Sequence, residues 1–206
     1  MSVWALVPAK AFERGKSRLA PALDDAARAA FARSLFDHVL GTLSASGVVD
    51  GILVATDSPS VAAAARAHGA AVRNDAPGVT TLAGVVDDGL ADLAARGART
   101  ALVLMADLPR LGVDDVRVLV AAAATHDVVL VRADDERHTN ALALPPGAMA
   151  TAFGRADSFD AHLAAARAAG LRVAVVDNAR VAFDVDGPDD HARMLASSAR
   201  KSATLA

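Results

Sequence analysis

Four cationic side chains lie close together near the start of the 206-residue chain. They fall within nine residues, and the set is Lys10, Arg14, Lys16 and Arg18. Lysine offers phosphate a point charge, arginine offers a two-pronged donor, and Gly15 lets backbone N–H groups approach closely. The segment therefore predicts a polyphosphate-binding loop, although a solvated basic turn would have the same composition.

The spacing in this loop differs from two familiar phosphate-binding motifs. Gly15, Lys16 and Ser17 match the end of a Walker A sequence, but the earlier glycine of that motif is missing. The Gly-x-Gly-x-x-Gly pattern of dinucleotide-binding folds is also missing here. A Rossmann dinucleotide site is therefore disfavoured.

Carboxylates occur in two segments farther along the chain. Asp107 follows an apolar run and is fixed by Pro109, whereas Asp184 and Asp186 lie two residues apart near the end. In an extended segment side chains at i and i+2 project to one side, and Mg²⁺ prefers carboxylate oxygens together with substrate phosphates. These residues predict a shared metal site. The alternatives are a helix cap for Asp107 and ordinary turn chemistry for the Asp186-Gly-Pro segment.

Two polar segments could hold a second, anionic substrate. In the first, His138 precedes the Thr139 hydroxyl and the Asn140 amide, although such a cluster is more often a loop cap. In the second, Asp157 or Ser158 can cap a helix whose N-terminus is a candidate anion site.

Short apolar runs alternate with longer segments of helical spacing, and these elements must position the polar residues. The runs cover residues 4–7, 51–56, 100–105, 127–131 and 171–176. The helical segments cover residues 24–47, 59–68, 82–95, 113–124 and 158–169. This alternation predicts an α/β fold with a mostly parallel central sheet and helices on both faces. Because ligands bind at the carboxyl ends of such strands, the basic and acidic loops are expected at one edge.

Composition narrows the class of protein. The length predicts one domain over residues 1–196, with residues 197–206 as a frayed tail. A net charge of −3 and 3% aromatic residues disfavour nucleic-acid binding, and no apolar run is long enough for a membrane helix. The absence of cysteine excludes disulfides and thiol chemistry. Without a basic leader segment, we expect a cytoplasmic protein.

Several motifs together resemble one family. They are Pro8-Ala9-Lys10, Gly15-Lys16-Ser17-Arg18-Leu19 with Pro21, Ala106-Asp107-Leu108-Pro109, Thr139-Asn140, Phe153-Gly154 with Ser158-Phe159 and His162, and Asp184-Val185-Asp186. This set resembles the 2-phospholactate/phosphoenolpyruvate guanylyltransferases of deazaflavin coenzyme (F-420) biosynthesis. The resemblance covers about residues 3–195 and is most specific over residues 16–21.

The resemblance implies a three-layer Rossmann-like nucleotidyltransferase fold, Mg²⁺ as cofactor and a homodimer. It implies that GMP passes from GTP to the phosphate of 2-phospholactate, phosphoenolpyruvate or 3-phosphoglycerate, with release of pyrophosphate. The alternatives are a cytidylyl- or molybdopterin-type nucleotidyltransferase, or a nucleotide-binding module without catalysis.

The resemblance also assigns roles to residues of this chain. Lys16, Arg18 and Asp107 would be catalytic. The GTP phosphates would be bound by Lys10, Lys16, Ser17 and Arg18, and Mg²⁺ by Asp107 with Asp184 or Asp186. The acceptor would contact His138, Thr139, Asn140, Gly154 and either Asp157 or Ser158. The chain departs from the family in having His138 where glycine is usual.

Overall fold

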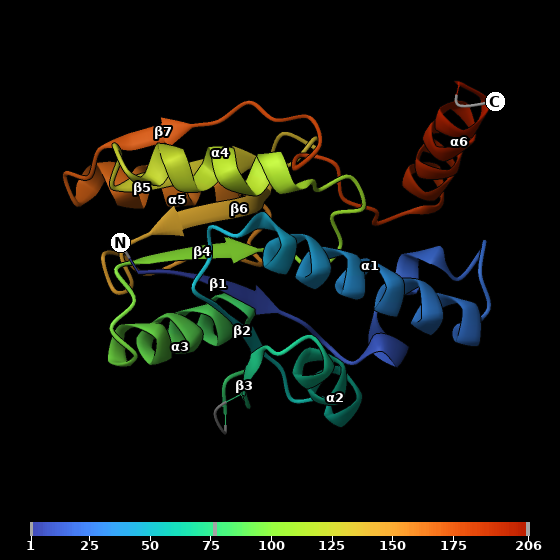
Figure 1. The fold of residues 1–206 in the computed structure, drawn as a ribbon, viewed down its shortest axis with the longest axis horizontal. Coiled ribbons are helices and arrows are strands. Elements are labelled where there is room, and N and C mark those ends of the chain that lie inside the picture. Colours follow the sequence, from blue (N-terminus) through green and yellow to red (C-terminus); the bar gives the residue numbers. More distant parts are fainter. Residues whose placement is uncertain (1, 76–77, 205–206) are drawn as a thin grey trace.

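A seven-stranded sheet forms the centre of the molecule (Figure 1). The computed structural model describes the backbone of residues 2–75 and 78–204, and the side chains of these residues as far as Ser197. The strands are β1 (Val3–Pro8), β2 (Gly51–Ala55), β3 (Ala71–Arg73), β4 (Thr100–Leu104), β5 (Val128–Arg132), β6 (Thr139–Leu144) and β7 (Val173–Val175). Their order is β3-β2-β1-β4-β6-β5-β7, and β6 runs antiparallel to both of its neighbours. The expected mostly parallel sheet is confirmed.

Helices cover both faces of the sheet. They are α1 (Asp25–Ser46), α2 (Pro59–Ala67), α3 (Leu82–Ala95), α4 (Val113–Ala123), α5 (Ser158–Ala168) and α6 (Pro188–Thr204). One core cluster joins α1, α2 and α4 to the sheet, and another joins α3 and α5 to the opposite face. Adjacent strand residues alternate between the clusters, as Leu6 and Val7 do, because successive side chains of a strand point to opposite faces. The three-layer prediction is therefore confirmed.

Local signals explain where several helices begin and end. The Asp24 side chain accepts a hydrogen bond from the Ala27 N–H at 2.8 Å and so caps α1, which ends at Gly47 in the left-handed conformation. Among the α-helices and strands of the described residues, β3, β6 and α6 have no sequence prediction. Residues 197–204, expected to be a frayed tail, continue α6, which projects from the layers in Figure 1.

The direction of β6 brings three distant segments to one edge. β1 and β4 are parallel neighbours, so the loops that follow Pro8 and Leu104 leave the sheet side by side. Since β6 runs the opposite way, it is the beginning of this strand, at Thr139, that lies beside the end of β4. The Met105 N–H donates to the Asn140 carbonyl at 3.2 Å and extends this pairing. Within the described residues no helix is long and apolar enough to cross a membrane.

Candidate active site at the carboxyl edge of the sheet

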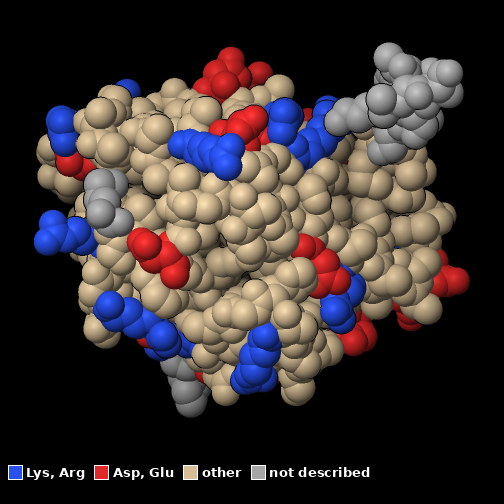
Figure 2. Space-filling view, viewed as in Figure 1, with Lys and Arg blue, Asp and Glu red and all other residues tan. Residues whose placement is uncertain are grey.

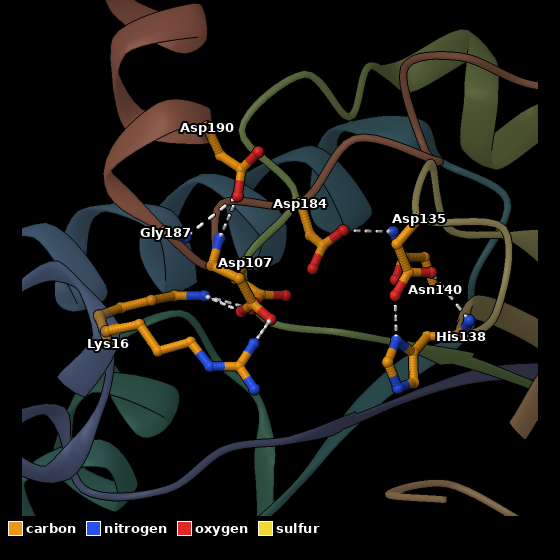
Figure 3. Close-up of polar contacts among 10 residues, drawn as sticks. Lys16, Asp107, Asp135, His138, Asn140, Asp184, Gly187 and Asp190 are labelled. Carbon is orange, nitrogen blue, oxygen red and sulfur yellow. Dashed lines mark hydrogen bonds and ion pairs between the residues drawn. The ribbon is translucent and has the colours of Figure 1, made fainter. Parts of the chain in front are cut away.

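Lys16 connects the basic loop to the acidic segments. It precedes the short 3₁₀ helix Ser17–Leu19 and has a left-handed backbone conformation, with φ of 54°, which is uncommon for a residue other than glycine. Its ammonium group pairs with the Asp107 carboxylate and lies 3.5 Å from Asp186 Oδ1 (Figure 3). Burial is the largest single effect and opposes the charged form, but the hydrogen bond and charge of Asp107 together with the charges of Asp186 and Asp184 outweigh it, so the pKa of Lys16 is raised. The side chain is therefore held as a cation at the centre of the site.

Three carboxylates surround this ammonium group. One oxygen from each of Asp107, Asp184 and Asp186 lies within 4.8 Å of the others. Arg18 contacts the outermost of them, with 3.3 Å between its guanidinium and Asp186 Oδ2. Burial, and secondarily the Asp107 carboxylate, raise the pKa of Asp184 to about 6. The raised pKa thus reflects burial first and the neighbouring negative charge second, and a partly buried cluster of hard oxygen donors fits a divalent cation such as Mg²⁺.

Asn140 attaches the C-terminal acidic segment to the sheet. Its Nδ2 lies 3.1 Å from the Val181 carbonyl, 2.9 Å from the Ala182 carbonyl and 3.2 Å from Asp184 Oδ1. Asn140 is itself buried at the start of β6. An amide –NH₂ can only donate, so all three contacts orient it toward this segment. Asn140 thus fixes the position of Asp184 opposite Asp107.

A cleft of about 260 Å³ opens beside the carboxylates. Its lining includes Asp107, Asp184, Asp186 and Arg18, together with the predicted acceptor residues His138, Thr139, Asn140, Gly154 and Ser158. The Thr139 N–H donates to Ser158 Oγ at 3.2 Å, which joins β6 to the first turn of α5. Gly154 has a φ of +85°, a conformation in which a side chain would be strained. His138 pairs with Asp135 at the rim of the cleft (Figure 3).

Two further clefts lie on the other side of Lys16, with volumes of about 220 and 450 Å³. Lys10 lines both of them, and Leu82, the first residue of α3, lines all three clefts. The larger one also contains Arg14 and Asp57, which form an ion pair at 3.3 Å. The three clefts therefore adjoin along one edge of the sheet and have Lys16 and Asp107 between them.

Most of the residues singled out in the sequence lie at this edge. Two do not line any of the three clefts: Ser17 is exposed, and Asp157 binds Arg155 through two contacts of 2.9 Å. Of the pair Asp157 and Ser158, only Ser158 lines the cleft that holds the acidic cluster.

Sequence reasoning missed several residues that line the clefts. Three of them are Asp57, Asp75 and Leu82. Asp57 had a usable signal, because it follows the predicted strand over residues 51–56 at its carboxyl end. Asp75 follows β3, which was too short to predict, and Leu82 has only an apolar side chain.

Solved structures with this fold include nucleotide-using transferases. A chain from Desulfovibrio desulfuricans assigned as a nucleotide-diphospho-sugar transferase superimposes with a TM-score of 0.74 at 16% identity, covering 91% of this chain and 84% of its own. CMP:2-keto-3-deoxy-manno-octonic acid synthetase, solved with CTP, gives a TM-score of 0.67 at 16% identity, covering 98% and 100%. At these identities the likeness establishes the fold, and the Rossmann-like nucleotidyltransferase prediction is confirmed.

Sequence relatives are closer. Phosphoenolpyruvate guanylyltransferase of Rubrobacter xylanophilus is 39% identical over 200 residues, which cover 96% of this chain and 95% of that protein. A 3-phospho-D-glycerate guanylyltransferase of Phenylobacterium zucineum is 34% identical (85% and 81% covered), and a 2-phospho-L-lactate guanylyltransferase of Methanothermobacter thermautotrophicus is 30% identical (92% and 82%). The family model described as "Guanylyl transferase CofC like" matches residues 3–204. The chain therefore belongs to the CofC-like guanylyltransferase family.

Proposed function

We propose that the protein transfers the guanylyl group of GTP to the phosphate of a small three-carbon phospho-acid and releases pyrophosphate, as a step of deazaflavin coenzyme biosynthesis. The acceptors named for its relatives are phosphoenolpyruvate, 3-phospho-D-glycerate and 2-phospho-L-lactate, each of which carries one phosphate and one carboxylate. One observation carries the proposal: the contact between Lys16 of the basic loop and Asp107 at the end of β4. It brings phosphate-binding cations and metal-binding carboxylates within reach of one triphosphate.

GTP occupies the two clefts on the Lys10 side in this proposal. The base and ribose lie in the larger cleft, whose lining combines Asp57 and Asp75 with apolar residues such as Val79 and Val85. The triphosphate extends toward Lys16, and Lys10 and Arg18 add positive charge on either side. A pyrophosphate leaving group acquires negative charge as it departs, and these cations lower the energy of that charge.

A divalent cation fits the carboxylate cluster. Asp107, Asp184 and Asp186 would hold it, because they offer hard oxygen donors in a partly buried, negatively charged setting. Bound there, Mg²⁺ would neutralise charge on the reacting phosphate. Asn140 supports this arrangement by fixing Asp184 through its amide.

The acceptor occupies the cleft lined by Thr139, Gly154 and Ser158. An oxygen of its phosphate forms the new bond to the α-phosphorus of GTP, and the bond from that phosphorus to the pyrophosphate oxygen breaks. A phosphate monoester is ionised at neutral pH, so the attacking oxygen needs no general base. The contribution of the protein is alignment of the two substrates and stabilisation of the leaving group by Lys16 and Arg18.

The test is incubation of the purified protein with GTP, Mg²⁺ and each of the three acids in turn. We expect pyrophosphate release with at least one acid and a product whose mass equals the acid plus GMP minus water. GTP without acid is the control for hydrolysis. If none of the acids yields a guanylylated product, the proposal is wrong.

A nucleotide panel tests the choice of base. With the best acid held constant, GTP is expected to give the highest kcat/KM among GTP, ATP, CTP and UTP. A preference for CTP would instead support a cytidylyltransferase, the activity of several proteins that share only the fold.

A further inference from the structure

His162 is a fully buried polar residue that the proposed reaction does not use. It lies on α5, has no exposed surface and packs edge-on against Phe153, with ring centroids 4.6 Å apart. Both ring nitrogens nevertheless have partners. A buried imidazole with two directed hydrogen bonds fixes the orientation of the groups that it bonds to, so both hydrogen-bond partners of His162 are held in place.

The first partner fixes the tautomer of the ring. The Ala152 backbone N–H donates to Nε2 at 2.8 Å. A backbone N–H can only donate, so Nε2 carries a lone pair and the proton of the neutral ring is on Nδ1. Burial lowers the pKa of His162 to about 4, against a smaller opposing effect of the Ser158 backbone carbonyl, so the ring is neutral at neutral pH.

The second partner is the Thr139 hydroxyl in the acceptor cleft. Nδ1 lies 3.0 Å from Thr139 Oγ1, and because Nδ1 carries the proton, the hydroxyl oxygen accepts. The hydrogen of that hydroxyl is then available for another acceptor. The Ser158 hydroxyl is in the same state, because its oxygen accepts the Thr139 N–H at 3.2 Å. Each of these two hydroxyls in one cleft thus has a hydrogen to donate, which suits an anionic group.

We propose that His162 is a positioning residue that makes Thr139 a hydrogen-bond donor to the acceptor and ties the turn before Gly154 to α5. The inference rests on the proposed function, since the ligand is the anionic acceptor of the same reaction. His162 does not touch this ligand itself, because the residues lining the cleft include Thr139, Gly154 and Ser158 but not His162.

A double-mutant cycle separates positioning from packing. The four proteins are the unmodified chain, His162→Phe, Thr139→Val and the double variant, each assayed at saturating GTP and then at saturating acid. We expect His162→Phe to raise the KM for the acid about tenfold, the value of one hydrogen bond to a charged group, and the KM for GTP less than twofold. In the Thr139→Val background the same substitution should change the KM for the acid less than twofold.

Equal effects of His162→Phe in both backgrounds, or an equal rise in the two KM values, would overturn the proposal. If His162→Phe does not fold, His162→Met takes its place, because its flexible side chain fills the same space and has no N–H to donate to Thr139. Phe159→Leu is the packing control, since Phe159 is buried on the same helix. This substitution is expected to lower the free energy of unfolding without coupling to Thr139.

Nitrogen-15 NMR of histidine-labelled protein provides a readout that needs no turnover. The proposal expects a neutral His162 ring protonated at Nδ1, and protonation at Nε2 would contradict it. Absence of turnover by the unmodified chain with every acid would count against the proposed function instead. The tautomer would then still decide how the Thr139 hydroxyl is oriented.

Discussion

The Lys16 ammonium occupies the space among the carboxylates that a divalent cation would also use. It contacts Asp107 and Asp186, so these carboxylates already have a positive partner before any ligand binds. The three carboxylates are approached by the cations Lys16 and Arg18, and the pKa of Asp184 is raised, first by burial and then by the Asp107 charge. An incoming triphosphate gives Lys16 a competing anionic partner. In the proposed reaction, release of the carboxylates and binding of the nucleotide would therefore be coupled through one side chain.

Asp107→Asn tests the acidic cluster directly. The amide keeps the size of the carboxylate but removes its charge, so metal holding and the Lys16 contact are both weakened. We expect kcat to fall at least about a thousandfold, as for loss of a principal electrostatic group, with the far-ultraviolet circular dichroism unchanged. The exposed Asp160, on α5, provides the matched control, and Asp160→Asn should stay within twofold of the unmodified chain. Near-normal turnover of Asp107→Asn would remove Asp107 from the active site.

Lys16→Met separates the two roles of the lysine. Without the ammonium, the carboxylates lose their competing cation, so the nucleotide-free protein should bind Mn²⁺ about tenfold more tightly. Turnover should nevertheless fall, because the triphosphate loses its cation. Mn²⁺ affinity is measured by the electron paramagnetic resonance of the free ion. Lys10→Met is the control for this measurement, since Lys10 lines the nucleotide clefts and not the one with the carboxylate cluster. Unchanged or weaker Mn²⁺ binding by Lys16→Met would show that the lysine does not compete for the site.

The close packing of α3 on the sheet sets the geometry of the edge that carries the three clefts. α3 begins at Leu82, which all three clefts share, so the position of this helix over the sheet determines their shapes. Gly89 lets the helix approach β1, because a Cβ built there would lie 2.8 Å from Leu6 Cδ1. Leu6 is fully buried and has little room to move.

Two glycine-to-alanine variants should therefore have opposite effects on stability. Gly89→Ala is expected to lower the free energy of unfolding by about 1–3 kcal/mol, as overpacking of a core does. Gly41→Ala, in the middle of α1 where the added methyl meets no atom within 4 Å other than its chain neighbours and the backbone of its own helix, should raise it by about 1 kcal/mol through helix propensity alone. Urea denaturation measures both. A stabilising Gly89→Ala would show that α3 and β1 are not in tight contact.

The packing of α5 on β6 should depend on pH through His162. Its pKa is about 4 in the folded protein and about 6.5 in an unfolded chain, so the unfolded state binds more protons between these values. The free energy of unfolding should fall by about 3 kcal/mol as the pH drops from 7 to 4, and this contribution is constant above pH 7. In His162→Gln the contribution is absent, so the difference between the two urea curves over this pH range isolates it. Parallel pH dependence of the two proteins would contradict the neutral, buried ring.

At the scale of the whole molecule, the sequence predicted the three layers and the sheet edge that carries the candidate site. It did not predict which strands pair with one another. The apolar runs 4–7 and 100–105 correspond to β1 and β4, and this is enough to bring the loops containing Lys16 and Asp107 together. The direction of β6 could not be predicted from the sequence, because strand pairing depends on contacts between residues far apart in the chain. For the same reason the sequence could not choose between Asp157 and Ser158, a choice that depends on the Arg155 ion pair and the Thr139 N–H.

The charge on the face of the molecule seen in Figure 2 does not favour anions. On the face seen in Figure 2, basic and acidic groups are interspersed, and the net charge is −3. In the proposed reaction, attraction for GTP would come from the cations of the site itself and from a divalent ion that offsets the carboxylates. The ligand would contact segments from the beginning, the middle and the end of the chain, because Lys16, Asp107 and Asp184 are all at this edge.

Binding of GTP with Mg²⁺ should accordingly stabilise the fold as a whole. At one hundred times the dissociation constant, a ligand that binds only the folded state adds about 2.7 kcal/mol, or roughly 5–10 °C in Tm for a chain of this size. Thermal unfolding with GTP and Mg²⁺ should show this shift, and GTP with a chelator should show a much smaller one. In Asp107→Asn the Mg²⁺-dependent part should disappear, while the part that depends on the cationic loop remains. An equal shift with and without Mg²⁺ in the unmodified chain would mean that the nucleotide binds away from the carboxylate cluster. The nucleotide site would then consist of the two clefts lined by Lys10 alone.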